Sequence, residues 1–309
     1  MLFLQKKGRV MKKITFNKIK KYVVYRLYDL LISIFYKLLF IKRPVENLIY
    51  YNQWKYYSLL KLFYNKKIDK SFEIIDESTP KIIWWCWLQG EQNAPDISLA
   101  CLASLRKNLS NFEIKIVTEK NMFDFICIPD YIKEKYEKGI ISKTHFSDIL
   151  RTCLLVEYGG TWIDSTVYCT GYRIDVLSLP LFFFSNIKRG DEGIALSNWM
   201  ITSCKNHPVL LNIRALLFDY WRKSNHLYHY FIYHFFATMV LDKYQEIKAN
   251  VPVFSNIPPH IMQFELFSIY SEERFKQFSI ISDFHKLTYK SEQYNDIKGS
   301  VYEYIINNR

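Results

Sequence analysis

The stretch of residues 141–168 constrains the fold of this chain more than any other, because three local signals follow one another in it. Apolar residues recur at helical spacing over residues 142–158, and Ser142 and Thr144 are both able to cap the start of that helix with a side-chain oxygen. Gly159 stands where a residue in the left-handed conformation commonly ends a helix. Aromatic and β-branched residues then dominate residues 161–168, as in a strand. The sequence therefore predicts a helix, a sharp stop and a strand in direct succession.

Charged residues occupy both halves of this stretch. Asp148 and Arg151 are three positions apart, so they are neighbours on the surface of the predicted helix and can form an ion pair. Asp164 lies within the apolar strand, where an unpaired carboxylate is costly or shifts its pKa. A metal ion or a cationic partner would remove that cost. A buried helix followed by an ordinary turn and strand is the alternative.

The order of these residues resembles the sugar-nucleotide glycosyltransferases of the Asp-x-Asp class, and most closely their capsular polysaccharide synthesis branch. The matching residues are Ser147, Asp148, Arg151, Tyr158, Gly159, Gly160, Trp162 and Asp164. In the wider class a second aspartate stands where this chain has Thr166, and the capsular branch is more similar to this variant. The resemblance implies a GT-A-like (Rossmann-like) α/β fold, in which a mixed sheet is flanked by helices. It also implies transfer from a nucleoside-diphosphate sugar, expected to be UDP-linked, with retention at the anomeric carbon.

The resemblance further implies roles for individual residues. Catalytic roles are expected for Asp148, Arg151, Asp164 and Asn198, and a site for Mn²⁺ or Mg²⁺ is expected at Asp164 and Thr166. The residues expected to bind the nucleotide sugar are Trp85, Trp87, Gln89, Ser147, Gly160, His285 and Lys286. Breaking the bond to a diphosphate develops negative charge on it, which a divalent cation or Lys and Arg must stabilise. The alternatives are core packing for the tryptophans, an ordinary polar position in a strand for Asn198, and a surface basic pair for His285 and Lys286.

The remaining elements alternate between strand and helix patterns. Strands are expected over residues 81–87, 113–118, 181–185 and 194–202, and helices over residues 50–64, 96–107, 130–138, 208–223, 229–249 and 271–278. This alternating order predicts an α/β domain with parallel strand pairing. His229 and His234 on one predicted helix are five positions apart and diverge, so we expect packing or acceptor contacts there rather than a metal site.

The net charge of +12 is concentrated in the N-terminal segment. Residues 1–70 contain 17 Lys and Arg against 3 Asp and Glu, whereas residues 71–309 contain 25 against 27. We therefore predict a basic amphipathic helical extension over residues 1–70 that associates with a membrane surface, followed by a GT-A-like glycosyltransferase domain over residues 71–309. A helix packed on the domain with solvated lysines is the alternative. Three charged residues within residues 22–41 argue against a spanning helix, because each costs at least about 2.5 kcal/mol at the centre of a bilayer.

The placement of the cysteines and of the charges indicates in which compartment the protein works and which kinds of partner it has. The six cysteines are dispersed without a CxxC pair, and several fall in apolar segments, as reduced buried thiols do. No secretory signal with a small-residue cleavage site is recognisable. We therefore expect a cytoplasmic enzyme, peripheral on the inner face of the cell membrane, with a saccharide or lipid-linked saccharide as acceptor in capsular or surface polysaccharide synthesis. The near-neutral region after residue 70 argues against a nucleic-acid partner.

Three other functions stay open on the sequence alone. A nucleotidyltransferase also binds a nucleotide at the edge of an α/β sheet, but it releases pyrophosphate rather than a nucleoside diphosphate. A non-catalytic membrane-surface protein would need no carboxylate after Gly160 and would bind no sugar nucleotide. A nucleic-acid binder, suggested by the pI of about 9.2, would bind with salt-dependent affinity.

Overall fold

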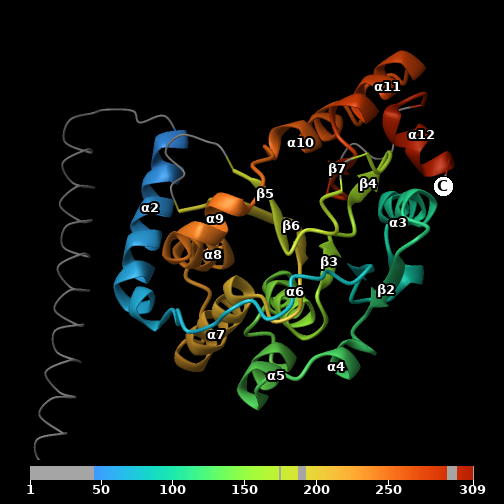
Figure 1. Ribbon diagram of the computed structural model, residues 1–309. Coiled ribbons are helices and arrows are strands. Elements are labelled where there is room, and N and C mark those ends of the chain that lie inside the picture. The colour runs from blue at the N-terminus through green and yellow to red at the C-terminus, as the bar shows by residue number, and fades with distance from the viewer. Residues whose placement is uncertain (1–44, 174, 187–192, 291–297, 309) are drawn as a thin grey trace, which may run out of the picture. The chain divides into compact units, whose positions relative to one another are not determined.

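The computed structural model describes residues 45–173, 175–186, 193–290 and 298–308, with only the course of the backbone at residues 45–52. Residues from Asn52 onward form one compact unit, drawn in Figure 1. The elements in chain order are α2 (Val45–Tyr64), η1 (Asn65–Lys67), β1 (Ile82–Cys86), η2 (Glu91–Asn93), α3 (Asp96–Asn108), β2 (Glu113–Val117), α4 (Met122–Phe125), α5 (Asp130–Glu137), α6 (Lys143–Tyr158), β3 (Gly160–Ile163), β4 (Val167–Cys169), β5 (Leu181–Ser185), β6 (Leu196–Ser203), α7 (Pro208–Lys223), α8 (Ile232–Lys243), α9 (Gln245–Asn250), α10 (Ile257–Phe264), α11 (Glu272–Ile281), β7 (Phe284–Lys286) and α12 (Val301–Asn307).

A five-stranded sheet organises this unit, with the strand order β2-β1-β3-β6-β5. Strand β1 pairs in parallel with β2 and β3, whereas β6 runs antiparallel to both β3 and β5. A second, two-stranded sheet pairs β4 with β7 in antiparallel orientation. The predicted α/β fold, a mixed sheet flanked by helices, is therefore confirmed.

The single strand expected over residues 161–168 is divided into two strands that belong to different sheets. Strand β3 stays in the large sheet, and the backbone nitrogen of Val167 then donates to the carbonyl oxygen of Asp164 at 3.0 Å. Strand β4 begins at Val167 and pairs with β7. The prediction of one continuous strand was wrong, because residues 164–166 form a turn and leave the ladder of the large sheet.

The helix expected over residues 229–249 is shorter and interrupted. It begins only at Ile232, and Tyr244 separates α8 from α9 with φ −107° and ψ 65°. The Tyr244 hydroxyl donates a hydrogen bond to the carbonyl oxygen of Asp69. A contact with a distant part of the chain therefore accompanies the break, which periodicity within the helix could not indicate.

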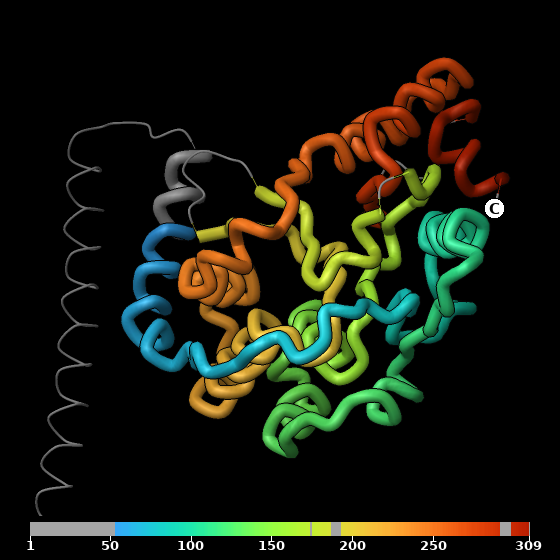
Figure 2. Tube along the Cα trace, viewed as in Figure 1, coloured from blue at the N-terminus to red at the C-terminus, as the bar shows by residue number. Residues whose placement is uncertain are grey.

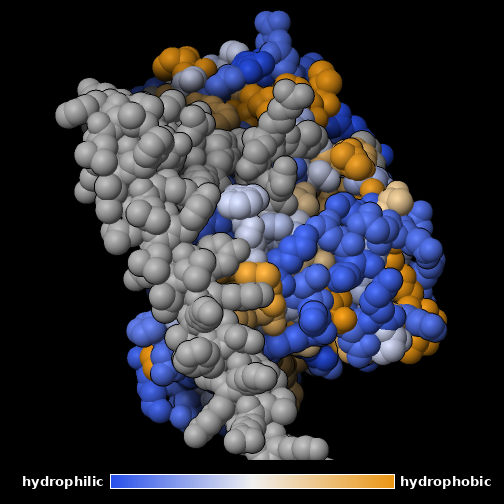
Figure 3. All heavy atoms as spheres, turned by 90° about the vertical axis from the view of Figure 1, so that its left-hand side faces the viewer, coloured by the Kyte–Doolittle hydropathy of each residue, from blue (hydrophilic) through white to orange (hydrophobic). Residues whose placement is uncertain are grey.

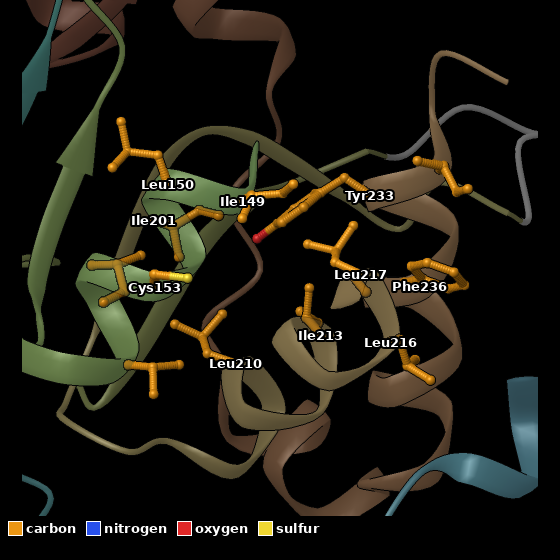
Figure 4. Close-up of a cluster of buried hydrophobic side chains, with 14 of the residues drawn as sticks. Ile149, Leu150, Cys153, Ile201, Leu210, Ile213, Leu216, Leu217, Tyr233 and Phe236 are labelled. Carbon is orange, nitrogen blue, oxygen red and sulfur yellow. The ribbon is translucent and has the colours of Figure 1, made fainter. Parts of the chain in front are cut away.

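The two faces of the large sheet bury different cores, because successive side chains of a strand point to opposite faces. In β1, Trp84 belongs to the larger core, which α6, α7 and α8 complete, while Ile83 and Trp85 belong to the core that α3 covers. Figure 4 shows side chains of α6, α7 and α8 meeting Ile201 of β6 in the larger core. Burying one side chain of this size contributes about 1.5–3 kcal/mol, so the two cores hold the sheet from both sides.

The C-terminal part of α2 packs into the larger core. Tyr57 and Tyr64 are buried, and their rings lie 6.0 and 5.0 Å, centroid to centroid, from Phe235 and Phe236 of α8. The helix expected over residues 50–64 is thereby confirmed.

The connection from α2 to β1, drawn in cyan in Figure 2, is held against α7. Asn212 Oδ1 accepts from the backbone nitrogen of Asp69 at 2.7 Å, and Asn212 Nδ2 donates to the carbonyl oxygen of Asp69 at 2.9 Å. One buried amide side chain therefore satisfies both backbone groups of a loop residue.

The membrane-facing part of the sequence prediction rests mainly on residues 1–44, which lie outside the described residues. Among the helices that are described, none is both long enough and apolar enough to cross a bilayer. On the face seen in Figure 3, hydrophobic side chains lie in small groups among hydrophilic ones.

Candidate active site

Helix α6 brings two opposite charges into the interior. Of the two predicted N-cap candidates, Ser142 rather than Thr144 sets its start, since the Ser142 side-chain oxygen accepts a hydrogen bond from the backbone nitrogen of His145. The side chains of Asp148 and Arg151 are only 10% and 6% exposed, and Arg151 Nη2 lies 3.3 Å from Asp148 Oδ1. The ion pair expected from their three-residue spacing is therefore formed, and it is buried.

The Asp148 carboxylate has partners from two further side chains. Asn198 of β6 donates from Nδ2 to Oδ1 at 2.8 Å, and His145 Nδ1 lies 3.4 Å from Oδ2. Burial raises the pKa of Asp148, but the charge of Arg151 and the hydrogen bond with His145 outweigh burial and hold the pKa below its usual value. Asp148 is therefore ionised at neutral pH although it is buried.

Asp164 directly follows the carboxyl end of β3, the central strand of the large sheet, on the side of the sheet where the parallel strands β1 and β3 both end. Its backbone nitrogen donates to the carbonyl oxygen of Trp199 at 2.8 Å, which fixes this residue against β6. Its Oδ1 accepts from Trp162 Nε1 at 2.9 Å and lies 3.6 Å from Arg151 Nη1, and its Oδ2 lies 3.1 Å from Lys286 Nζ. Since a quarter of its side chain is exposed, Asp164 connects the buried ion pair to solvent.

Lys286 reaches Asp164 from near the end of the chain because β7 pairs with β4. The register places Lys286 opposite Val167, and the backbone nitrogen of Leu287 donates to the carbonyl oxygen of Thr166 at 2.8 Å. Lys286 Nζ donates to Thr166 Oγ1 at 2.6 Å and lies 3.1 Å from Asp164 Oδ2. One ammonium group therefore contacts both of the residues that were predicted from the sequence to bind a metal ion.

The residues around Asp164 do not fit a divalent cation in this arrangement. Mg²⁺ and Mn²⁺ require several oxygen ligands in regular geometry, whereas the oxygens of Asp164 and Thr166 already receive Lys286. Within the described ranges, His, Cys, Asp and Glu side chains form no cluster of three or more that could hold a metal. The Mn²⁺ or Mg²⁺ site expected at Asp164 and Thr166 stays a prediction.

The protein family follows from comparison with known families. A family model described as "Capsular polysaccharide synthesis protein" matches residues 63–305, which is most of the chain. The chain belongs to this family. The resemblance stated from the sequence is thereby confirmed, and with it the class of enzyme, a glycosyltransferase.

Three solved structures resemble this capsular polysaccharide synthesis protein at low similarity. The PaToxG glycosyltransferase has a TM-score of 0.39 at 17% identity, covering 66% of this chain and 81% of its own. The apo-form glycosyltransferase GlyE of Streptococcus pneumoniae TIGR4 has a TM-score of 0.39 at 14% identity, covering 74% and 63%. A transferase double mutant has a TM-score of 0.35 at 13% identity, covering 67% and 92%. No curated protein matches the chain.

Two residues expected to bind the nucleotide lie at the same edge of the sheet as Asp164. Trp87 and Gln89 follow the carboxyl end of β1, and β1 is the parallel neighbour of β3. The Trp87 ring lies edge-on to Tyr289, with 5.3 Å between ring centroids, so the segment after β7 meets the segment after β1. Ligands of open α/β sheets bind at this edge, outside the carboxyl ends of the strands.

Three other residues expected to bind the nucleotide are buried. Trp85 has no exposed surface and lies in the core under α3, so the packing alternative accounts for its position. Gly160 has φ +90°, and a Cβ there would lie 2.6 Å from the carbonyl oxygen of Ile82, so its role is in the backbone. His285 Nε2 lies 3.1 Å from Thr170 Oγ1, and burial lowers the pKa of His285 to about 4, so its imidazole is neutral at pH 7. These three residues are buried in this arrangement, and their expected contacts with the nucleotide stay predictions.

Two partners of the carboxylates, His145 and Trp162, were given no role on the basis of the sequence. His145 lies one helical turn before Asp148, and Trp162 lies two residues before Asp164, so spacing alone could have indicated both. His234 of α8 is within electrostatic range of Asp148, and burial lowers the pKa of His234 to about 4. The imidazole of His234 is therefore neutral at pH 7.

A separate cavity of about 290 Å³ lies among β5, β7, α10 and α11. Its wall is largely apolar and includes Phe182, Phe184 and Phe254, with the ion pair of Arg173 and Asp283 also lining it. The residues that line this cavity, all in the described part of the chain, include none of the predicted site residues. The carboxylates and the cavity are therefore distinct features of the fold.

Proposed function

We propose that this glycosyltransferase moves a sugar from a UDP-linked donor to a saccharide or lipid-linked saccharide acceptor in capsular or surface polysaccharide synthesis. The observation that supports the proposal is a row of four charges running from α6 to β7. Asp148, Arg151, Asp164 and Lys286 alternate in sign, and successive members lie 3.3, 3.6 and 3.1 Å apart. The buried end of the row fixes the exposed end, which faces solvent at the carboxyl ends of the parallel strands.

The exposed end of the row is the part that would touch the donor. Lys286 would hold the diphosphate, and Asp164 with Asn198 would accept hydrogen bonds from sugar hydroxyls. Arg151 is a positioning residue, because its guanidinium is buried between two carboxylates and also donates to the carbonyl oxygen of Asn198. Asp148 likewise acts through Arg151 and Asn198.

The base and ribose would lie farther along the same edge. Trp87 and Gln89 follow the neighbouring parallel strand, and the edge-on contact of Trp87 with Tyr289 joins this segment to the one that follows β7. Ser147 is partly exposed, and its hydroxyl receives Arg151 Nη2 at 3.2 Å, so it would contact the donor from the α6 side.

The reaction is a group transfer without net oxidation. The bond between the anomeric carbon and the diphosphate oxygen breaks, and the electron pair stays on that oxygen. The acceptor hydroxyl oxygen forms the new bond, and its proton leaves to solvent. The family resemblance implies retention at the anomeric carbon. A preorganised cation at the leaving oxygen contributes typically about 10²–10³-fold to such a step.

The proposal also places the enzyme on the inner face of the cell membrane through the basic residues of the extension predicted over residues 1–70, although the last part of that extension packs in the core of the catalytic domain predicted over residues 71–309. The charge count supports it, since residues 1–44 alone contain 12 Lys and Arg and a single acidic residue. Tyr57 and Tyr64 belong to the core, so a truncation that tests membrane binding should begin at residue 45. Full-length protein should sediment with phosphatidylglycerol vesicles, the truncated protein should not, and equal sedimentation of both would contradict this placement.

The activity itself is tested with UDP-sugars and a matched pair of isosteric variants. Asp164→Asn should lower release of UDP from the competent UDP-sugar by at least about 10²-fold. Glu246→Gln, which alters an exposed carboxylate on α9, should have no effect. Full activity of Asp164→Asn would refute the role of Asp164.

The reaction products separate the proposal from its rivals. A glycosyltransferase releases a nucleoside diphosphate, whereas a nucleotidyltransferase releases pyrophosphate. Absence of any sugar-nucleotide binding by the full chain would favour a non-catalytic protein and would end the proposal.

A further inference from the structure

We propose that the Lys286 ammonium takes the place of a divalent cation at this site, so that the enzyme binds the donor diphosphate and transfers the sugar without a metal. The inference rests on the proposed function and names the group that holds the leaving diphosphate. It departs from the sequence-based expectation of Mn²⁺ or Mg²⁺ at Asp164 and Thr166.

The position of the ammonium is the first argument. An Asp-x-Asp site offers oxygens two residues apart to one metal, and the corresponding oxygens here are Asp164 Oδ2 and Thr166 Oγ1. Lys286 Nζ lies 3.1 Å from the first and 2.6 Å from the second, so it bridges the pair as a cation would. An ammonium group has three N–H donors. Among the described residues, Asp164 Oδ2 and Thr166 Oγ1 accept two of them. A third remains for a phosphate oxygen on the exposed side, where 21% of the Lys286 side chain is open to solvent.

The backbone holds this lysine in place, which is the second argument. Strand β7 pairs with β4 directly after the turn at residues 164–166, and the register sets Lys286 opposite Val167. The hydrogen bond from Leu287 N to Thr166 O continues the pairing at 2.8 Å. The buried Phe284 and Leu287 anchor β7 from both sides of the lysine. The ammonium is therefore positioned before the donor arrives, as electrostatic stabilisation of a leaving group requires.

The other oxygen of Asp164 supplies the third argument. Oδ1 accepts from the Trp162 indole at 2.9 Å and lies 3.6 Å from Arg151, whose guanidinium also stands 4.9 Å over the Trp162 ring. Both carboxylate oxygens therefore already receive donors from fixed groups. A dication added at Oδ2 would stand beside the positive charge of Lys286, whereas an added diphosphate would be attracted to it.

The charges of the site balance without a metal. Asp148 and Asp164 carry two negative charges, and Arg151 and Lys286 carry two positive ones. When the glycosidic bond breaks, the electron pair passes to the diphosphate oxygen, and the anomeric carbon bonds to the acceptor oxygen. The Lys286 ammonium stabilises the new charge through a hydrogen bond and keeps its proton, so no further reactant is required.

The test compares UDP binding to the full-length protein in excess EDTA and in excess Mn²⁺, by titration calorimetry. We expect the same dissociation constant in both conditions, and the same rate of UDP release from the competent UDP-sugar. Loss of UDP binding in EDTA with recovery in Mn²⁺ would overturn the inference.

Variants of Lys286 test the assignment to this side chain. Lys286→Met should weaken UDP binding in EDTA by about 10–150-fold, as expected for loss of one charged hydrogen bond. Lys286→Gln keeps an N–H donor for Asp164 and Thr166, so the turn at residues 164–166 keeps a hydrogen-bonding partner. The substitution removes the positive charge, and it therefore tests the contribution of that charge to UDP binding. Lys276→Met, which alters an exposed lysine on α11, is the matched control and should bind UDP normally. Unchanged UDP binding by both Lys286 variants would overturn the inference.

Failure of this inference differs from failure of the proposed function. If UDP binding and sugar transfer occur only with Mn²⁺, the glycosyltransferase function stands and the role of Lys286 is wrong. If neither condition gives binding of UDP or release of UDP from any UDP-sugar, the proposed function itself fails, and the present inference fails with it.

Discussion

Removal of the buried guanidinium tests the electrostatic argument for the site most directly. The perturbation is Arg151→Met, which keeps most of the side-chain volume but removes the positive charge between Asp148 and Asp164. Asp148 would then remain buried with only Asn198 and His145 as partners. Breaking a buried ion pair on one side typically costs about 3–5 kcal/mol, because an uncompensated charge is left inside. For a chain of this size, the melting temperature should fall by about 6–20 °C.

The stability lost in Arg151→Met should depend on pH, and the pKa of Asp148 determines the direction of that dependence. In the wild type, Arg151 holds the pKa of Asp148 below its usual value, so the stability contributed by the carboxylate is lost only as the pH falls through that low folded-state pKa. In Arg151→Met, burial acts without the compensating charge and raises the pKa of Asp148 above its unfolded value. The deficit of the variant should therefore be largest at pH 7 and should shrink as the pH approaches 4.

The assay is urea unfolding at pH 7 and at pH 4.5, followed by tryptophan fluorescence. Arg214→Met is the matched control, because the Arg214–Glu157 pair is partly exposed and should be worth at most about 1 kcal/mol. Adding Asp148→Asn to Arg151→Met should restore part of the loss, since it removes the orphaned charge. A deficit of Arg151→Met below about 1 kcal/mol at pH 7, or one that is the same at both pH values, would refute the reasoning.

Acid stability and backbone geometry give two more predictions. Burial lowers the pKa of His207, His234 and His285 to about 4, so the unfolded chain binds protons that the native imidazoles do not. The free energy of unfolding should therefore fall as the pH is lowered from about 6.5 to about 4, by up to about 1.4 kcal/mol per pH unit for each imidazole, and His207→Asn should reduce that slope; an unchanged slope would contradict the assignment. Gly160→Ala should lower the free energy of unfolding by more than about 2 kcal/mol. The new Cβ would lie 2.6 Å from the carbonyl oxygen of Ile82, and the alanine would also have to adopt φ +90°. Gly139→Ala, at φ +69° with no heavy atom within 4 Å of the new Cβ, is the control and should cost about 1–2 kcal/mol in the same urea assay; equal losses would refute the steric argument.

The comparison of sequence and structure is clearest along residues 141–168. The helix end at Gly159 and the pairing of Asp148 with Arg151 were predicted, and Ser142 was one of two predicted cap candidates, because each feature depends on residues within about one helical turn. The turn at residues 164–166 was missed, since the strand pattern continues across it and only the pairing of β4 with β7 ends the ladder.

The partners of the carboxylates illustrate the same limit. The sequence named Asn198 and Lys286 through a family resemblance, but it could not say which atoms they reach. Asn198 meets Asp148 across 50 positions of the chain, and Lys286 meets Thr166 across 120. The side of the sheet to which Trp85 points was likewise open, because an apolar strand buried on both faces shows no alternation.

The sequence by itself determined the family, the alternation of helices and strands, and a carboxylate at the end of the strand after Gly160. Those properties follow from short-range periodicity, turn chemistry and a motif of closely spaced residues. Only the tertiary structure decided what neutralises that carboxylate. Whether a metal ion or a side chain stands beside Asp164 depends on where β7 returns to the sheet, and the pairing of distant strands sets that position, which no local pattern encodes.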